Sequence, residues 1–340
     1  MIDHLVLPAP STNRVYAGSA AEVLGAELEV VLPGIDPTSI AVTEVGGVDH
    51  VALRAPTDAA ALARVSGIWM AYERVAPDLL RPLTRPRADL LDEDLITIPR
   101  YQGKTNEQFT RLMVNLAMAT VDHDQLGRGG PLDVLDPMCG RGTTISCAWL
   151  AGHNGFGVES DQSAIEAHAT FLRTWLRRKR LKHKLTVNPV RRDGKNLGKR
   201  LDVTLTPPGP TLPDASASLT GAIMPGDARD SLVLWGKRRF DAIVTDTPYG
   251  VVHGSRRAGS GSRDRSAAGL LADAVPQWAD QLRPGGAMVI AWNTLGLARA
   301  DLVSIMDDAG VTVHDTGPWR RFAHRVDSSI HRDLAVGLRR

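Results

Sequence analysis

Residues 133–143 read DVLDPMCGRGT, a short apolar strand that runs into a glycine-rich turn and then into a helix. Gly140 and Gly142 let the main chain turn tightly and approach a ligand closely. Thr143 would begin the helix, and the free amides of a helix N-terminus favour an anionic group such as a carboxylate or a phosphate. The stretch therefore predicts a strand–turn–helix unit with a ligand site at the carboxyl end of the strand.

Strand and helix patterns alternate along the chain from about residue 100 onward. This alternation predicts an α/β fold built on a mostly parallel, doubly wound sheet. Two final segments, 311–316 and 333–338, are expected to form an antiparallel pair. The expected strands are 133–136, 155–160, a short run at Ile223, 242–246 and 287–292, and the expected helices are 143–151, 163–179, 267–282 and 298–309.

The first 95 residues have a different pattern from the rest. A helix is expected within 20–32, a strand at 48–53 and an amphipathic helix at 59–72. This mixture predicts a small α+β domain at 1–95. The prolines between residues 80 and 99 are typical of a linker, after which a second domain is expected to occupy the remainder, 96–340.

The composition narrows the class of protein. The 340 residues are 43% hydrophobic and carry a formal net charge of +2. Two cysteines, Cys139 and Cys147, are too few for a disulfide framework or a zinc site, and the histidines show no metal-ligand spacing, so no metal is expected. Because no apolar run approaches the length that crosses a bilayer and the first residues lack a signal-peptide pattern, a cytoplasmic location without membrane contact is the expectation.

The positive charge is concentrated in one segment. Residues 173–200 hold twelve Lys or Arg against one acid, Asp193, at the start of an expected insertion around 180–220. This density predicts contact with a polyanion, and a solvated helix face is the alternative. A Gly/Ser-rich segment further on could also contact nucleic acid, with a solvent loop as its alternative. The candidate nucleic-acid-binding residues are Arg177, Arg178, Lys179, Arg180, Arg256 and Arg257.

Acids stand where successive strands of the sheet are expected to end. Asp136 ends the first strand, Glu159 the second, and Asp227 follows the third. Glu159 could accept hydrogen bonds from ribose hydroxyls and Asp227 from an adenine amino group, although single acids at such positions are often helix caps. The dinucleotide pattern G-x-G-x-x-G and the P-loop lysine are both absent, which favours S-adenosylmethionine as the cofactor.

A fourth strand is expected to end in the sequence DTPYG, residues 246–250. An exocyclic amine on a heteroaromatic ring is a poor nucleophile because its lone pair is delocalised. Two acceptors on its two hydrogens, the Asp246 carboxylate and the Thr247 carbonyl, would favour the pyramidal, nucleophilic form. Pro248 completes the turn, and Tyr249 offers an aromatic face on which a base can stack. A methyl donor then needs only in-line placement.

This segment resembles the D/N-P-P-Y/F motif of amino-group methyltransferases. With LDPMCG at 135–140 and YQGKTN at 101–106, residues 95–340 resemble the tRNA guanine-N2 methyltransferases that carry THUMP-type RNA-binding domains. The resemblance implies a class I, Rossmann-like methyltransferase fold. Arg141 and Thr247 depart from the motifs of that family, and residues 1–95 are too few for a ferredoxin-like start plus a full THUMP domain, so a reduced version is expected.

The resemblance also implies roles for individual residues. Asp246 would hold the target amine, together with Thr247, Pro248 and Tyr249. The segment around residue 105 would pack near the methionine end of the cofactor. The residues expected at the cofactor are Thr105, Asn106, Asp136, Cys139, Gly140, Gly142, Thr143, Glu159 and Asp227.

These patterns lead to one preferred function and two alternatives. The preferred function is methyl transfer from S-adenosylmethionine to an exocyclic amine of a nucleobase, guanine N2 in tRNA in particular. The base would have to be extruded from any helix. The alternatives are a DNA methyltransferase acting on adenine N6 or cytosine N4, and a non-catalytic RNA-binding protein that keeps the fold. RNA is the expected partner, and the sequence does not indicate whether a protein subunit is required.

Overall fold

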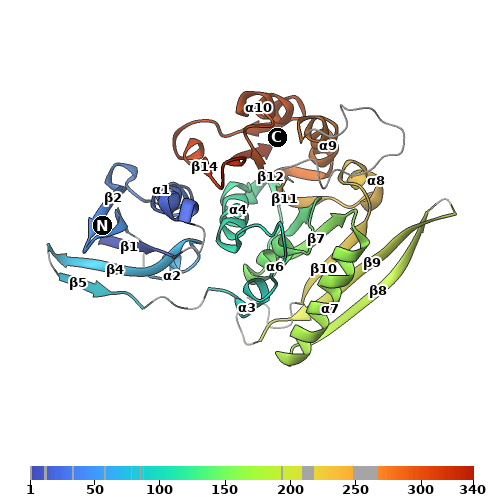
Figure 1. The fold of residues 1–340 in the computed structure, drawn as a ribbon, viewed down its shortest axis with the longest axis horizontal. Coiled ribbons are helices and arrows are strands. Elements are labelled where there is room, and N and C mark those ends of the chain that lie inside the picture. The colour runs from blue at the N-terminus through green and yellow to red at the C-terminus, as the bar shows by residue number, and fades with distance from the viewer. Residues whose placement is uncertain are drawn as a thin grey trace.

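The computed structural model describes residues 2–10, 14–32, 34–56, 59–77, 79–84, 86, 88–192, 194–208, 218–247 and 267–340. These residues form two sheets that lie at opposite ends of the molecule, with helices between and around them (Figure 1). No helix in these ranges has the length and apolar character that crossing a bilayer requires.

The N-terminal sheet has five strands in the order β2-β3-β1-β4-β5, and every pairing in it is antiparallel. Helix α1 covers one face, where Leu24 and Leu28 pack against Val6 and Val51. The elements are β1 (Ile2–Pro8), α1 (Arg14–Val31), η1 (Pro37–Ser39), β2 (Ala41–Val45), β3 (Val48–Ala55), α2 (Ala59–Leu62), β4 (Ile68–Ala76) and β5 (Leu79–Pro82).

The prediction of an amphipathic helix at 59–72 is wrong. Helix α2 ends at Leu62 and strand β4 begins at Ile68. Over so short a segment the helical and strand periods are hard to distinguish. Pairing with β1, in which Val6 stands opposite Ala71, satisfies the backbone as a strand and places Ala71 in the core beneath α1.

The second sheet has the order β13-β15-β12-β11-β6-β7-β10-β9-β8, with β14 paired to β15. Its central strands, from β12 to β10 in that order, are parallel, whereas the pairings at both flanks are antiparallel. The strands are β6 (Asp133–Asp136), β7 (Asn154–Glu159), β8 (Lys182–Arg192), β9 (Lys195–Thr206), β10 (Leu219–Pro225), β11 (Phe240–Asp246), β12 (Leu282–Asn293), β13 (Val311–Val313), β14 (His324–Arg325) and β15 (His331–Arg339).

The sheet is therefore mixed, and the expectation of a mostly parallel sheet is corrected at its edges. The pairing of β13 with β15 was expected, but the β8–β9 hairpin was not. Leu201, Val203 and Leu205 of β9 are buried, yet the lysines and arginines of this segment conceal the alternating apolar pattern of a strand. The basic segment thus contributes two strands that extend the sheet beyond β10.

Helices cover both faces of the second sheet (Figure 1). On one face α4, α6 and α7 pack in a core that includes Val134, and on the other α9 and α10 pack in a core that includes Leu135. Neighbouring residues of β6 therefore point into opposite layers. The helices are α3 (Asp94–Thr97), α4 (Glu107–Thr120), α5 (His123–Leu126), α6 (Thr143–Leu150), α7 (Gln162–Arg178), η2 (Ala228–Asp230), α8 (Ser231–Trp235), α9 (Ala267–Gln281), α10 (Arg299–Asp308) and η5 (Gly317–Arg320).

Helix α1 joins the two parts of the molecule by lying against α4 (Figure 1). The side-chain amide of Asn115 on α4 donates to Glu27 Oε1 of α1 at 2.8 Å and to the Arg64 carbonyl at 2.8 Å. Burial raises the pKa of Glu27, although hydrogen bonds from Ser66 and Asn115 oppose the rise. Arg321 forms an ion pair with Glu29 near the same contact. The N-terminal sheet is therefore docked through polar contacts as well as apolar ones.

Candidate active site

The acids predicted at strand ends lie at one edge of the sheet. Strands β11, β6, β7 and β10 are neighbours and run parallel, so Asp246, Asp136 and Glu159 end adjacent strands and Asp227 follows the next one. The Thr245 hydroxyl of β11 donates to Asp136 Oδ1 of β6 at 2.8 Å, which ties the ends of those two strands together. The carboxyl edge of the parallel strands is where ligands of open α/β sheets bind.

The glycine-rich turn lies against this row of acids. Gly140 and Gly142 have φ of 51° and 74°, in the left-handed region that favours glycine. The Gly140 amide donates to Glu159 Oε2 at 2.8 Å, and no side chain caps the start of α6 at Gly142. A Cβ added to Gly140 would meet no described heavy atom within 4 Å. The turn thus leaves open space beside an uncapped helix N-terminus.

Three residues of this turn, Cys139, Arg141 and Thr143, contact other parts of the chain. Cys139 is buried, and burial raises the pKa of its thiol well above the usual value. A Cβ on Gly157 would lie 2.5 Å from Cys139 Sγ, so the cysteine packs tightly against β7. The Thr143 hydroxyl lies 2.9 Å from the Tyr101 hydroxyl, and the Arg141 guanidinium lies over the Tyr101 ring at 4.9 Å. The segment around Tyr101 therefore flanks the glycine-rich turn.

Asp136 is almost completely buried and has hydrogen-bond donors around it. Its Oδ1 accepts from the Met138 amide at 3.0 Å and from Thr245. Burial raises the pKa of Asp136 to about 6, because the hydrogen bonds from Thr144, Thr245 and Met138 only partly offset desolvation and the negative charge of Asp246 adds to it. This carboxyl group is therefore close to its titration range at neutral pH.

Glu159 and Asp227 already make hydrogen bonds within the chain. Glu159 accepts from Gly140 and, through Oε1, from the Asp161 amide at 2.7 Å. Asp227 caps η2 by accepting from the Arg229 amide at 2.9 Å, and it also pairs with the Arg229 guanidinium at 2.8 Å. The helix-cap interpretation thus describes Asp227 in this structure. Carboxylate oxygens can accept more than one hydrogen bond, so both groups can still receive donors from a ligand.

Asp246 is contacted from two distant parts of the chain. Thr105 Oγ1 donates to Asp246 Oδ2 at 2.5 Å, and Arg332 Nη2 lies 3.4 Å from the same oxygen. The Thr247 amide donates to the Ala291 carbonyl at 2.9 Å and prolongs the pairing of β11 with β12. Asn106 caps α4, because its Oδ1 accepts from the Gln108 amide at 2.8 Å. Pro248, Tyr249, Arg256 and Arg257 lie outside the described residues.

Arg332 is a site residue that the sequence analysis missed. It stands on the antiparallel strand β15, opposite Asn293 at the carboxyl end of β12, and its guanidinium lies over the Phe109 ring at 4.8 Å. In the sequence it lies one residue before the last expected strand, 333–338, and nothing in that position indicates a site residue. His324 packs edge-on against Phe109 at 5.0 Å, and burial lowers the pKa of His324 to about 4.

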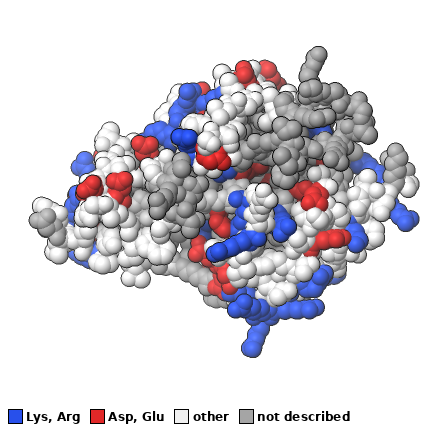
Figure 2. All heavy atoms as spheres, in the orientation of Figure 1, with Lys and Arg blue, Asp and Glu red and all other residues white. Residues whose placement is uncertain are grey.

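The basic segment is divided between the two edges of the sheet. Helix α7 starts beyond Glu159 at the carboxyl edge, and its 17 residues run back to the opposite edge, about 25 Å away at 1.5 Å per residue. The exposed Arg177, Arg178 and Arg180 therefore lie at the amino edge, where Lys and Arg gather below α7 in Figure 2. Lys179 is engaged with Asp92 at 2.8 Å and Asp94 at 2.6 Å.

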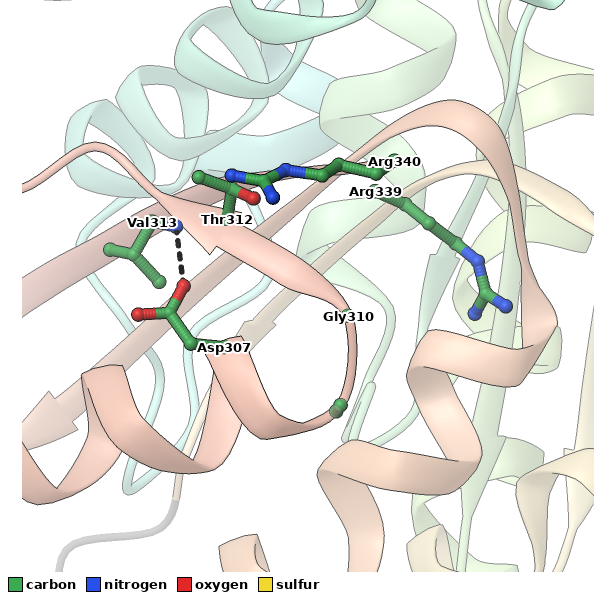
Figure 3. Close-up of a pocket in the computed structure, with 7 residues that line it drawn as sticks. Asp307, Gly310, Thr312, Val313, Arg339 and Arg340 are labelled. Atoms are coloured by element: carbon green, nitrogen blue, oxygen red, sulfur yellow. Dashed lines mark hydrogen bonds between the residues drawn. The ribbon is translucent and has the colours of Figure 1, made fainter.

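A separate cavity of about 450 Å³ lies at the amino edge, between the end of α10 and the paired ends of β13 and β15 (Figure 3). Asp307 Oδ1 accepts from the Val313 amide there at 3.2 Å. Because the cavity is at the opposite edge from the row of acids, it is not part of the candidate active site. Its lining residues are Asp307, Ala309, Gly310, Thr312, Val313, Arg339 and Arg340.

Comparisons with known proteins give structural similarities of low identity. No protein-family model matches the chain, and no curated protein matches it in sequence. TrmN from Thermus thermophilus is 13% identical with a TM-score of 0.47, and the match covers 100% of both chains.

Two further solved structures resemble smaller parts of the chain. Magnesium protoporphyrin IX methyltransferase from Synechocystis, solved with bound SAM, is 14% identical with a TM-score of 0.36, covering 71% of this chain and 87% of that one. The fibrillarin pre-rRNA processing protein of Methanococcus jannaschii is 11% identical with a TM-score of 0.38, covering 88% and 97%. At TM-scores below 0.5 these similarities assign no activity, and the function is inferred from the residues of the site.

Proposed function

We propose that the protein transfers a methyl group from S-adenosylmethionine to an exocyclic amine of a nucleobase, and that the substrate is guanine N2 in tRNA. The observation that carries the proposal is the position of Asp246. Its carboxylate ends β11 next to Asp136, beside the glycine-rich turn, and the Thr105 hydroxyl bonds to it at 2.5 Å. The DPMCGRGT motif and the two described residues of the DTPYG motif, Asp246 and Thr247, thus lie at one edge of one sheet, and both motifs resemble those of guanine-N2 methyltransferases.

The residues at this edge fit the proposed cofactor. The open space at Gly140 admits a ligand close to the main chain, and the uncapped start of α6 favours its carboxylate. Glu159 and Asp227 offer carboxylate oxygens to ribose hydroxyls and to the adenine amine. When bound, S-adenosylmethionine supplies the methyl group as an electrophile on a sulfonium. We assign the remaining cofactor contacts to the other residues predicted from the sequence, which are Thr105, Asn106, Asp136, Cys139, Gly142 and Thr143.

The part that the chain itself plays is to make the amine nucleophilic. Asp246 accepts a hydrogen bond from one N–H of the amine, and the Thr247 carbonyl accepts from the other. Both acceptors draw electron density toward nitrogen and hold the amine out of conjugation with its ring. Asp246 also offers a place for the proton that the nitrogen loses. We assign Tyr249 to stack on the base and hold its plane, and Pro248 to shape the turn.

RNA is proposed as the substrate because positive charge is exposed at several places on the surface. Arg177, Arg178 and Arg180 are exposed at the amino edge of the sheet, and a folded tRNA is large enough to reach both edges. Such contacts with phosphates position a substrate without reading its sequence. We assign Arg256 and Arg257 to the same role, whereas the ammonium of Lys179 is paired with Asp92 and Asp94 and is not assigned to it.

The experiment follows methyl incorporation from labelled S-adenosylmethionine into tRNA and into double-stranded DNA. We expect the wild type to label tRNA, and Asp246→Ala to lose at least about a thousandfold in turnover while cofactor affinity changes by less than about threefold. Asp301→Ala, an exposed carboxylate on α10, is the control and should match the wild type. Unchanged turnover in Asp246→Ala would exclude the mechanism. Labelling of DNA alone would replace the RNA substrate with DNA.

A further inference from the structure

We propose that Arg332 is a positioning residue that fixes the Asp246 carboxylate for the substrate amine, acting together with Thr105. This inference rests on the proposed function, because it assigns a second layer of residues to the same site. Arg332 belongs to β15, which runs antiparallel to the strands that carry the predicted site. Neither DTPYG nor the glycine-rich turn contains a cation that could take its place, apart from Arg141, which lies over Tyr101.

Two donors converge on one oxygen of Asp246. Thr105 Oγ1 is 2.5 Å from Oδ2 and Arg332 Nη2 is 3.4 Å from it. Thr105 precedes α4 while Arg332 lies on β15, so the donors come from separate elements. A carboxylate held at one oxygen from two directions has a fixed rotamer and a fixed plane. This fixes the direction in which it accepts a hydrogen bond, which is the property that catalysis by orientation requires.

Arg332 is itself held in place by its surroundings. Its side chain is only 7% exposed, and its guanidinium lies 4.8 Å from the centre of the Phe109 ring. A cation over an aromatic face is attracted by the ring quadrupole, more strongly where water is excluded. His324 packs against the edge of the same ring. The guanidinium therefore has one defined position, with Phe109 beneath it and Asp246 beside it.

The charges around Asp246 indicate why a cation is needed here. In the part of the chain that the structure describes, the titratable or charged groups around it include Asp136 from β6, Arg332 from β15 and, behind Phe109, His324 from β14. Burial keeps His324 neutral near pH 7, because its pKa is about 4. Arg332 thus offsets the repulsion between the two carboxylates. The Arg332–Asp246 pair presents no net charge, which suits a neutral aromatic amine better than an aliphatic ammonium ion.

A double-mutant cycle tests whether Arg332 acts through Asp246. We expect Arg332→Met to lower kcat by about 100-fold in the Asp246 background. Asp246→Asn keeps an acceptor oxygen and has no charge to be oriented, so in that background Arg332→Met should cost less than about threefold. Equal costs in the two backgrounds would overturn the proposal, because Arg332 would then act independently of Asp246.

The pH dependence separates positioning from a general loss of structure. With Arg332 replaced by Met, the acidic limb of the kcat/KM profile should move to higher pH by about one unit, whereas Arg332→Lys should keep the limb in place and lower kcat by about tenfold. Arg325→Met is the matched control, since Arg325 is an exposed arginine on β14, and it should behave as the wild type. A limb that stays in place in Arg332→Met would contradict the proposal.

A measurement without substrate keeps the test independent of activity. The ¹³C resonance of the Asp246 carboxylate, assigned by its loss in Asp246→Asn, can be observed at neutral pH in the protein alone. We expect it to shift and broaden in Arg332→Met, because the carboxylate then has several orientations, and to be unchanged in Arg325→Met. If Arg332→Met does not fold, the double variant with Asp246→Asn leaves no unbalanced charge, and its turnover should equal that of Asp246→Asn alone. A greater loss would overturn the proposal.

Failure of the inference is distinguishable from failure of the proposed function. If wild-type protein methylates no nucleic acid, the proposed function fails, and the carboxylate resonance still shows whether Arg332 fixes the orientation of Asp246. If the wild type is active and Arg332→Met retains its kcat and its pH profile, the proposed function stands and the inference fails.

Discussion

Strands β6 and β11 both carry aspartates near each end, and the two ends differ in how those aspartates are satisfied. At the amino edge, Asp241 is completely buried and accepts from Arg128 at 3.0 Å, from Arg283 at 2.8 Å and from the Asp133 amide at 2.7 Å. At the carboxyl edge, Asp246 accepts from the Thr105 hydroxyl and lies 3.4 Å from Arg332, and the donors to Asp136 are neutral.

The difference lies in whether the partners of each aspartate come from the fold itself or leave room for a ligand. Two cations and an amide use the hydrogen-bonding capacity of Asp241 within the fold, so its charge is balanced before any ligand arrives. Carboxylates at the carboxyl edge lie beside an uncapped helix and open space at Gly140. Perturbed titration in such surroundings is typical of functional sites. Under the proposed function, the aspartates at the two ends of β11 therefore have different roles, one structural and one in binding the substrate amine.

The largest expected effect is the loss of stability on replacing Asp241, the aspartate at the amino end of β11. Asp241→Ala removes the partner of two arginines and leaves the Asp133 amide buried without its acceptor, so the free energy of unfolding should fall by about 4 kcal/mol. The turnover of the folded molecules should change by less than about twofold. Urea denaturation and single-turnover assays measure the two quantities. A large loss of turnover at unchanged stability would reverse the assignment of the two edges.

The next largest effect is the pH dependence of stability that Asp136 causes, measured against Asp136→Asn. A carboxyl whose folded pKa is raised from 3.8 to about 6 binds its proton more tightly when folded. Its contribution to stability is therefore complete below pH 4 and is lost as pH rises toward 6, on the order of 3 kcal/mol. The stability of Asp136→Asn relative to wild type should thus increase across this window and level off above it. Denaturation midpoints at several pH values measure it, and a flat difference would contradict the burial argument.

The sequence predicted much of the carboxyl edge and little of what surrounds it. Local signals were sufficient for the strand–turn–helix at residues 133–143 and for the strand before Asp246, because glycines and strand-end acids leave a short-range pattern. Arg332 left no such pattern, since it reaches Asp246 only through the pairing of β15 with β12. Contacts of that kind depend on sheet order, which local periodicity does not encode.

Errors elsewhere have the same origin. In the segment 59–72 the helix ends at Leu62, and residues 68–72 form the start of β4 because β1 supplies their partner. The charge of 173–200 was recognised, but its division between two edges follows from the length of α7 and the return of the β8–β9 hairpin. Asp227 fits both a cap and a ligand contact by sequence, and the structure shows the cap.

The smallest expected effect concerns the charge at the amino edge. Replacing Arg177, Arg178 and Arg180 with Ser should weaken RNA binding and reduce the slope of log K against log salt by about one for each phosphate that these arginines neutralise. Turnover at saturating RNA should stay the same, because these residues are at the opposite edge from Asp246. Filter binding at several salt concentrations measures the slope.

Lys179→Gln is the control within the same turn. Its ammonium is already paired with Asp92 and Asp94, so its replacement should alter the slope less than the replacement of any one of the three arginines. A slope that does not change in the triple variant would identify this surface as a solvated helix end.

The most direct measurement is mass spectrometry of nucleosides from tRNA treated with S-adenosylmethionine and either wild-type or Asp246→Ala protein. The account predicts N2-methylguanosine with the wild type and none above background with the variant, while the variant still binds the cofactor. The appearance of the same methylated nucleoside with both proteins, or of methyl groups only on ring carbons or ribose oxygens, would contradict it.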